Sequence, residues 1–325
     1  MNIDSAPMPS ASDQVRSPNL TPHVAILLAT KNGAPYLSDQ LSSYVQQTFG
    51  EWSLYVSDDG STDNTIDIIH RFAASHDRVK SIRQGPQQGF VRNFLSLAQD
   101  KSILGDYFAF SDQDDIWYPD KIERALSFLK DVPRSVPALY FSRTEVVDAN
   151  LNHLGLSPLF TKQPAFQNAL IQNIGGGNTM VFNSAAKRLL ELGVHGNVAS
   201  HDWWTYQIVT AVGGTAIYDE RPSLKYRQHP GNVLGSNQGA RARLRRIFLL
   251  FESKFQQWND SNISALRHLS VNFNTTSQTT LDRFVDARNA RFLAMRLLRL
   301  YQSGVYRQTF LSNLALIAAC ALRKI

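Results

Sequence analysis

The chain has 325 residues, of which 43% are hydrophobic and 18% are charged, and one cysteine, Cys320. This composition supports a large packed core and excludes a wholly disordered chain, a collagen-like repeat and a disulfide scaffold. The formal net charge of +6 is unevenly spread. Residues 1–240 carry 19 Lys and Arg against 23 Asp and Glu, whereas residues 241–325 carry 14 against 4. Because the body is mildly acidic, the positive total does not indicate a nucleic-acid-binding protein, and no nucleic acid partner is expected.

The ends of the chain and its cysteine content predict where the protein resides. Residues 1–20 are rich in Ser, Pro and small polar types, and they predict a disordered leader without the pattern of a secretory signal. The most apolar run, from Phe310 to Leu322, is too short to cross a bilayer. Cys320 cannot form an internal disulfide, which suits a reducing compartment. We therefore expect a cytoplasmic protein, either soluble or peripheral at the inner face of the cytoplasmic membrane.

From residue 23 onward, short apolar runs alternate with segments whose apolar residues recur at helical spacing. The predicted strands are 23–29, 52–57, 79–83 and 107–111, and the predicted helices are 36–47, 64–75, 89–99 and 119–130. Thr62 is expected to cap the second helix and Pro119 to open the fourth. Strands that alternate with helices predict an α/β fold, with a mostly parallel sheet covered by helices on both faces.

The pattern is less regular in the second half of the body, and residues 143–166 are expected to form a loop. The elements predicted after it are a strand at 178–183, helices at 184–192 and from 201 onward, and strands at 215–219 and 224–227. Beyond Gly239 no strand pattern remains. We therefore place the α/β domain at 21–239 and an all-helical basic region at 240–325.

Two acidic clusters directly follow predicted strands. Asp58 and Asp59 come after the second strand, and Asp112, Asp114 and Asp115 come after the fourth. In open parallel sheets, ligands bind outside the carboxyl ends of the strands, so both clusters are candidates for one site. Three carboxylates within four residues repel one another unless a cation offsets them, and Mg²⁺ typically binds carboxylates together with phosphate oxygens. The second cluster therefore predicts a metal–diphosphate site, with a solvated, helix-capping turn as the alternative.

Two aspartates have both a functional and a structural interpretation. Asp59 is placed to accept the imide N–H of a uracil or thymine base, although strand-to-helix turns also use Asp, Gly and Ser as caps. Asp202, next to His201, is a candidate general base directed into the cleft, or else a helix N-cap.

Seven segments in a fixed order carry a resemblance to a known family. They are HVAILLATKNG, YVSDDGSTDNT, GFVRNF, SDQDDIWYPDKI, GGGNTMVFN, HDWW and YRQHPGN, and they extend over about residues 22–235. The chain resembles the family 2 glycosyltransferases of the GT-A fold, and within them it is most similar to bacterial rhamnosyltransferases that build surface polysaccharides such as lipopolysaccharide O-antigen. The resemblance implies transfer of a sugar from a nucleotide diphosphate with inversion at the anomeric carbon. The chain lacks the QxxRW segment of processive synthases, which favours addition of a single sugar.

The resemblance also implies which residues bind the donor and a divalent cation, Mg²⁺ or Mn²⁺. Asp114 is expected to bind the metal directly, and Asp112 to bind the ribose or a metal-bound water. His229 is a candidate third metal ligand or diphosphate contact, because imidazole is a normal ligand for Mn²⁺, with a turn histidine as the alternative. Asp115 is expected to cap the next helix. The residues expected to contact the donor nucleotide are Ala29, Thr30, Asp59, Arg92 and Asp112.

The resemblance assigns Asp202 as the catalytic base, which takes the proton of the acceptor hydroxyl. Gly176 and Gly177 permit close backbone approach to the acceptor or donor sugar. Trp203 and Trp204 are candidates for an apolar wall of the same pocket, with core packing as an equal alternative.

The donor is expected to be dTDP- or UDP-linked, with a deoxysugar such as rhamnose favoured by similarity, and the acceptor to be a glycan or lipid-linked glycan. One alternative is a nucleotide-sugar-binding module without catalysis, which intact Asp114 and Asp202 disfavour. A second is a nucleotidyltransferase. That class normally carries a Gly-rich basic loop after the first strand, and the ATKNG turn is a poor version of it.

The basic region combines arginines with apolar residues. Its arginines include Arg241, Arg243, Arg245 and Arg246 before the apolar run 247–251, and Arg288, Arg291, Arg296 and Arg299 among Phe and Leu residues. A basic amphipathic helix is typical of a membrane-surface element, which would be attracted to anionic lipid. The alternative is a helical appendage that packs on the body or forms a homo-oligomer with a second subunit.

Overall fold

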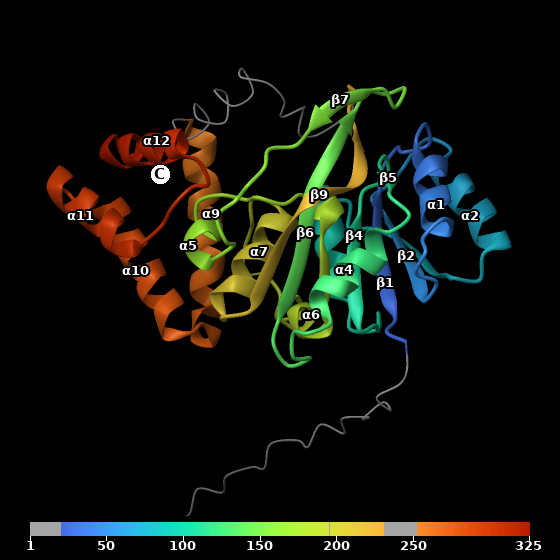
Figure 1. The fold of residues 1–325 in the computed structure, drawn as a ribbon, viewed down its shortest axis with the longest axis horizontal. Coiled ribbons are helices and arrows are strands. Elements are labelled where there is room, and N and C mark those ends of the chain that lie inside the picture. Colours follow the sequence, from blue (N-terminus) through green and yellow to red (C-terminus); the bar gives the residue numbers. More distant parts are fainter. Residues whose placement is uncertain (1–20, 195, 231–251) are drawn as a thin grey trace, which may run out of the picture.

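The computed structural model describes residues 21–194, 196–230 and 252–325, and within them the chain folds around one mixed, mostly parallel sheet (Figure 1). The strands lie in the order β3-β2-β1-β4-β8-β6-β9-β5, and β7 pairs with β6 beside this path. The strands are β1 (Val24–Thr30), β2 (Trp52–Asp58), β3 (Val79–Gln84), β4 (Tyr107–Ser111), β5 (Ile116–Trp117), β6 (Ala138–Val147), β7 (His153–Leu156), β8 (Val181–Asn183) and β9 (Thr215–Arg227).

Helices cover both faces of the sheet, as predicted. Those of the body are α1 (Leu37–Val45), α2 (Thr65–Ser75), α3 (Phe90–Ala98), α4 (Lys121–Leu129), α5 (Phe166–Ala169), α6 (Ser184–Glu191) and α7 (His201–Ala211), with the short 3₁₀ helix η1 (Gly177–Thr179). Ala25 and Leu27 of β1 belong to one buried apolar cluster, with α3, α6 and α7. Val24, Ile26 and Leu28 belong to a second cluster, with α1, α2 and α4. β1 is therefore buried on both faces, as its continuous apolar run predicts.

The strand register brings the two acidic clusters to one edge. β1 pairs in parallel with β2, so that Thr30 lies opposite Asp58, and with β4, so that Leu28 lies opposite Ser111. The loops that carry Asp59 and Asp112 therefore leave the sheet next to the end of β1, at the same carboxyl edge.

The expected loop at 143–166 is wrong in its first half, because β6 continues to Val147 and β7 pairs with it. The charged residues that break the strand pattern have local partners. The Arg143 guanidinium donates to the carbonyl of Ser157, and Glu145 accepts hydrogen bonds from Tyr118 and His153. These partners make a polar strand stable where periodicity alone indicates a loop.

Two smaller predictions also need correction. The two strands predicted at 215–219 and 224–227 form one strand, β9, whose pairing with β6 contains register shifts. Thr62 does not cap α2, because the helix begins at Thr65 and the Asp63 carboxylate accepts the Thr65 backbone N–H instead.

The part of the basic region that the structure describes is helical, as predicted, with α9 (Ser253–Leu269), η3 (Ser270–Asn272), α10 (Thr275–Asn289), α11 (Leu293–Ser303) and α12 (Phe310–Ala321). The expected leader, the boundary at 239/240 and the four arginines between 241 and 246 lie outside the described residues. Among the described residues, no helix combines the length and the apolar character needed to cross a bilayer.

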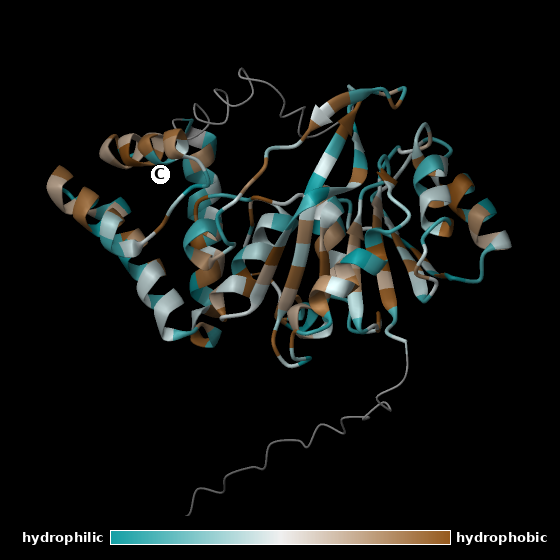
Figure 2. Ribbon diagram, in the orientation of Figure 1, coloured by the Kyte–Doolittle hydropathy of each residue, from teal (hydrophilic) through white to brown (hydrophobic). Residues whose placement is uncertain are grey.

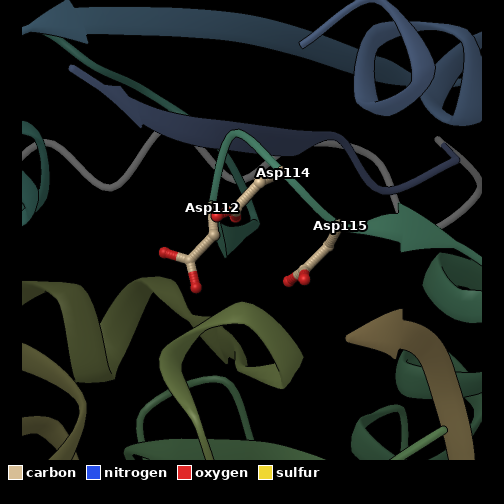
Figure 3. A group of neighbouring side chains, drawn as sticks. All are labelled: Asp112, Asp114 and Asp115. Carbon is tan, nitrogen blue, oxygen red and sulfur yellow. The ribbon is translucent and has the colours of Figure 1, made fainter. Parts of the chain in front are cut away.

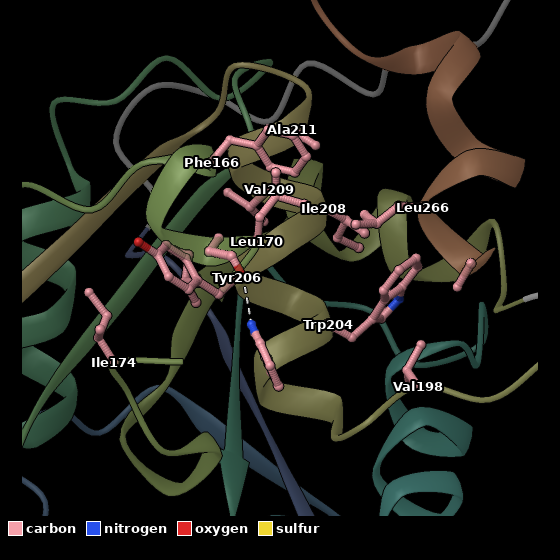
Figure 4. Close-up of a cluster of buried hydrophobic side chains, with 14 of the residues drawn as sticks. Phe166, Leu170, Ile174, Val198, Trp204, Tyr206, Ile208, Val209, Ala211 and Leu266 are labelled. Atoms are coloured by element: carbon pink, nitrogen blue, oxygen red, sulfur yellow. Dashed lines mark hydrogen bonds between the residues drawn. The ribbon is translucent and has the colours of Figure 1, made fainter. Parts of the chain in front are cut away.

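The C-terminal helices and the body share one core. Figure 4 shows Trp204 and Ile208 of α7 on the side that faces Leu266 of α9, and Leu266 is fully buried. A second connection is polar: the buried Arg307 guanidinium donates to the carbonyl of Ile171, and Gln308 exchanges two hydrogen bonds with the backbone of Lys162. The helices after residue 252 are therefore packed on the body and form part of the same core.

We expect Leu266→Ala to lower the free energy of unfolding by about 2–5 kcal/mol, because it removes buried methyl groups and leaves a cavity under Trp204. Ser264→Ala, at an exposed position of the same helix, is the matched control. Urea unfolding followed by circular dichroism and tryptophan fluorescence checks this. Two separate transitions, with only one shifted in the variant, would contradict a shared core.

Candidate active site

Asp112, Asp114 and Asp115 occupy the loop between β4 and β5 (Figure 3). One oxygen from each carboxylate lies within 4.8 Å of the others. Asp112 and Asp114 are partly exposed, whereas Asp115 is fully buried. The predicted cluster is thus assembled at the carboxyl edge of the sheet, with two partly exposed carboxylates and one buried carboxylate.

The cluster is short of positive charge. Burial, together with the charges of Asp114 and Asp202, raises the pKa of Asp112 to about 8. Burial and the charges of Asp114 and Asp112 raise the pKa of Asp115 well above its ordinary value. Each shift expresses a preference for the neutral form where carboxylates lie side by side in low dielectric. The effect of the Asp202 charge on the pKa of Asp112 also indicates that the two groups lie close together.

Lys121, the first residue of α4, lies behind the cluster and is fully buried. Its ammonium donates to the backbone carbonyl of Asn178 and lies 4.0 Å from the centre of the Trp117 ring. Burial lowers the pKa of Lys121 to about 7, although the charges of Asp115 and Asp112 act in the opposite direction. The Asn178 amide in turn donates to Asp115 Oδ2 at 2.6 Å. Asp115 therefore joins the start of β5 to η1. The expectation that it caps the next helix is wrong, because the N-cap of α4 is Asp120.

Two residues from the end of β9 approach the cluster on its other side. The Arg227 guanidinium donates to the carbonyl of Asp114 at 3.1 Å and forms an ion pair with Asp39 at 2.7 Å. The Nε2 atom of His229 lies 2.8 Å from Asp114 Oδ2. The structure thus brings together the predicted pair Asp114 and His229.

Gln113, between Asp112 and Asp114, is fixed by the backbone of Lys31. Its side-chain amide accepts from the backbone N–H of Lys31 at 2.8 Å and donates to the carbonyl of the same residue at 2.9 Å. This pairing joins the acidic loop to the loop after β1. A Cβ atom at Gly33 would overlap the Gln113 amide, which explains the glycine of the ATKNG turn.

Asp202 lies in the first turn of α7 and is 9% exposed. Its Oδ1 atom accepts the backbone N–H of Trp203 at 2.6 Å and the hydroxyl of Ser200, and its Oδ2 atom accepts the backbone N–H of Gly177 at 3.1 Å. The N-terminal end of a helix favours a negative charge, so this position stabilises the carboxylate. The N-cap residue is Ser200, and Asp202 is therefore not the cap that the structural interpretation proposed.

The η1 turn connects the acidic cluster with Asp202. Asn178 holds Asp115 while Gly177 holds Asp202, so two neighbouring residues fix both groups. A Cβ atom at Gly177 would overlap the Nε2 atom of His201, so only glycine fits here. The glycine therefore permits approach to a protein side chain. Gly176 is exposed and adjoins the same turn, and its contact with a sugar stays a prediction.

The predicted base-recognition residues lie at the ends of β1 and β2. Both oxygens of Asp59 are engaged, since Oδ1 accepts the backbone N–H of Gln87 at 2.6 Å and Oδ2 that of Gly89 at 2.9 Å. Thr30 donates its hydroxyl to Asp58 at 2.8 Å, and Ala29 is buried beside it. Asp59 thus orders the loop before α3, and contact of these residues with a nucleobase stays a prediction.

Arg92 lies on the first turn of α3, and its guanidinium donates to the Gly196 carbonyl and, at 3.2 Å, to Asn197 Oδ1. It therefore connects α3 to the segment before α7. Contact of Arg92 with a diphosphate stays a prediction.

Both tryptophans are core residues, which favours the structural alternative over a sugar-binding wall. Trp204 is fully buried and Trp203 is 5% exposed. The Trp203 indole donates to the carbonyl of Ala169 at 2.6 Å and stacks near Phe255 of α9. Residues at helical spacing face several directions, and α9 covers the side of α7 that the tryptophans occupy.

The donor set fits a divalent cation. Asp112 and Asp114 offer hard, partly exposed oxygen ligands whose mutual repulsion a cation would relieve, and His229 is hydrogen-bonded to Asp114 as an orienting partner often is. Asp115 is held inward by Asn178.

Comparison with known proteins identifies the family. Residues 25–190, about half of the chain, match the sequence profile described as glycosyl transferase family 2. The chain belongs to this family. The dTDP-rhamnosyl transferase RfbG of Shigella flexneri is 30% identical to this family 2 glycosyltransferase over 238 residues, which are 69% of this chain and 78% of that protein. A glucosyltransferase of Escherichia coli, WfgD, described as acting on α-D-GlcNAc-diphosphoundecaprenol with UDP-Glc, is 27% identical over 47% of this chain and 57% of its own length.

Solved structures confirm the predicted GT-A fold of the family 2 chain. TarS of S. aureus in complex with UDP-GlcNAc has a TM-score of 0.54 at 13% identity, covering 93% of this chain and 90% of that one. A mannosyltransferase from Pyrobaculum calidifontis in complex with GDP-Man and Mn²⁺ has a TM-score of 0.50 at 17% identity, covering 96% and 88%. At this identity the likeness extends to the fold alone.

No structural role was predicted from the sequence for His201, which lies next to Asp202. Its ring stacks on Phe94 at 3.9 Å between centroids and meets the edge of Phe110 at 4.9 Å. Neither ring nitrogen has a hydrogen-bond partner among the described residues. Burial lowers the pKa of His201 to about 4, against the opposing charge of Asp202.

We expect His201 to make stability depend on pH. Its pKa in the folded state lies below the value of 6.5 for a free histidine, so unfolding takes up a proton and stability is lost as the pH falls from about 6.5 toward 4. His201→Phe keeps the stacking and should remove on the order of 3 kcal/mol of this pH dependence of the unfolding free energy. Urea titrations at neutral pH and near pH 4 measure it, with His70→Phe at an exposed position as the control. If the unfolding free energy changed equally with pH in wild type and in the His201 variant, His201 would not be the source of the pH dependence.

Proposed function

We propose that this family 2 glycosyltransferase transfers one deoxysugar from a nucleotide diphosphate donor to a glycan or lipid-linked glycan, with inversion and with a divalent cation. The observation that carries the proposal is the convergence of Asp112, Asp114 and Asp202 at the carboxyl edge of the sheet, where the charge of Asp202 acts on Asp112. Convergent carboxylates of this kind suit diphosphate binding on one side and proton transfer on the other.

The donor in this proposal is dTDP-rhamnose. Its support is the similarity to RfbG, which is described as a dTDP-rhamnosyl transferase and of which the chain spans 78%. The description of WfgD, which names a diphosphoundecaprenol-linked acceptor, is what favours a lipid-linked acceptor here. Asp59, Ala29 and Thr30 are proposed to contact the thymine base, and Arg92 the diphosphate.

Asp202 is proposed as the catalytic base. The acceptor oxygen forms the new bond to the anomeric carbon, its proton passes to Asp202, and the nucleoside diphosphate leaves from the opposite face of the sugar. Gly177, Ser200 and Trp203 hold the carboxylate by three hydrogen bonds, which fix its orientation before the acceptor arrives. A divalent cation held by Asp114 and Asp112, with His229 as a third ligand or orienting partner, would offset the charge on the leaving diphosphate. Arg92 would act on the same charge.

We expect Asp114→Ala to abolish the cation dependence of donor binding, because Asp114 is the proposed direct ligand. In wild type, dTDP-rhamnose should raise the melting temperature only when Mg²⁺ or Mn²⁺ is present, and the variant should lose about tenfold or more in donor affinity by calorimetry. Asp67→Ala, an exposed carboxylate of α2, is the matched control. UDP-glucose and GDP-mannose are tested in parallel. Tighter binding of either donor would overturn the proposed donor, and binding unaffected by EDTA would overturn the metal.

We expect Asp202→Asn to lower release of dTDP from dTDP-rhamnose by about 10²-fold or more, while donor affinity stays close to wild type. The new amide would meet the N–H of Gly177, so the melting temperature is measured alongside the rate. Asp131→Asn, at an exposed position after α4, is the control. Wild-type turnover in the Asp202 variant would show that another group takes the proton.

A further inference from the structure

The exposed large apolar side chains that the structure describes are concentrated in α11 and α12. Among the described residues, ten of the nineteen large apolar side chains that are exposed lie between 292 and 322, and the other nine are scattered from Val45 to Val271. Tyr301 is 85% exposed, Phe310 74% and Phe292 70%. The ten residues, here called the α11–α12 surface, are Phe292, Leu293, Met295, Leu298, Tyr301, Phe310, Leu311, Leu314, Ile317 and Leu322.

The surface follows the spacing of a helix face. Phe292, Met295, Leu298 and Tyr301 recur every three residues along α11, and α12 carries a similar row. The opposite faces are already used, because Leu300 of α11 and Leu316, Ala319 and Cys320 of α12 are buried in the shared core. α12 is therefore apolar on both its inner and its outer side, whereas the buried side of α11 also holds Arg296 and Ser303. A helix that is apolar all round normally has cover on every side.

The charged residues of the α11–α12 segment have one sign, although Arg288 is paired with Asp260 of α9 and Arg296 and Arg307 are buried. Residues 287–325 contain seven Lys and Arg and no Asp or Glu. Arg291, Arg323 and Lys324 are exposed, and the Arg323 guanidinium donates to the carbonyl of Arg291. This bond joins the end of α12 to the start of α11. Arg291 thus directly precedes the apolar row of α11, and Arg323 and Lys324 follow that of α12; the two helices lie at the same end of the molecule (Figure 1).

The charge pattern distinguishes between two occupants. In a symmetric pairing with a second copy, arginines would approach arginines, and the sequence from 287 to 325 offers no carboxylate to pair with them. An anionic lipid surface offers phosphate groups to the cations and an acyl boundary to the apolar row. Figure 2 shows brown segments along both helices, at the end of the molecule away from α1 and α2.

We propose that the α11–α12 surface binds an anionic lipid bilayer, with its apolar row in the interface and Arg291, Arg323 and Lys324 at the level of the headgroups. None of the residues proposed to bind the donor, the cation or the acceptor belongs to this surface. The proposal therefore goes beyond the glycosyltransferase activity and stands or fails independently of it.

The test uses the full chain and flotation with vesicles of phosphatidylcholine, with or without about 30% phosphatidylglycerol. Wild type should float with the anionic vesicles, and binding should fall by about fivefold or more with neutral vesicles or in high salt. Phe310→Gln/Leu314→Gln should lower binding at least as much, and Arg291→Gln/Arg323→Gln should lower only the anionic component.

The matched controls remove the same chemistry elsewhere. Leu104→Gln/Val271→Gln replaces two apolar residues with exposures of 73% and 83%, and Arg71→Gln/Lys101→Gln replaces two exposed cations. Both should bind as wild type does, and all variants should keep the melting temperature and dTDP release of wild type. Wild-type flotation by the Phe310/Leu314 variant would overturn the proposal. The proposal would also be overturned if neither wild type nor any variant bound vesicles, and if light scattering showed a wild-type dimer that the Phe310/Leu314 variant no longer forms.

Discussion

The structure depends on the crowding of carboxylates at the end of β4. Three aspartates in four residues repel one another in low dielectric, and the charge of Asp202 on α7 also acts on Asp112. Distant elements surround the cluster: Lys121 at the start of α4 lowers the pKa values of Asp112 and Asp115, the Arg227 guanidinium at the end of β9 donates to the Asp114 carbonyl, and His229 is hydrogen-bonded to Asp114. The order of the strands, with β9 crossing back beside β6 and meeting β5, is what carries these groups to one edge.

The η1 turn gives this arrangement its precision. Asn178 pairs with Asp115 and Gly177 with Asp202, so the distance between the acidic cluster and the proposed base is set by one short piece of backbone. Lys121 supports that backbone from behind through the carbonyl of Asn178. A displacement of the turn would therefore move both halves of the proposed chemistry at once.

Much of this could be predicted from sequence, and the remainder has a physical reason. The buried strands and the DQDD cluster at a strand end depend on local patterns, and the structure has them where those patterns indicate. β6 was missed beyond Arg143 because its charged residues form hydrogen bonds with Tyr118, just after β5, and Ser157, just after β7. The roles of Lys121, Asn178 and Arg227 could not be predicted, because each is defined by a partner 57 to 113 positions away. The tryptophans of α7 were ambiguous because the helix that covers them begins about fifty residues later.

Because of this covering helix, the core of the protein extends beyond the segment that matches the family. The family profile ends at residue 190 and the sheet ends at Arg227, yet Trp204 and Ile208 remain buried only while Leu266 and its neighbours lie over them. A chain shortened after His229 would retain every residue proposed for catalysis and would expose an indole next to the proposed base. The segment that carries the proposed catalytic residues is thus shorter than the segment that forms the shared core. Substitutions in α9 are compatible with this fold only while α9 continues to cover α7.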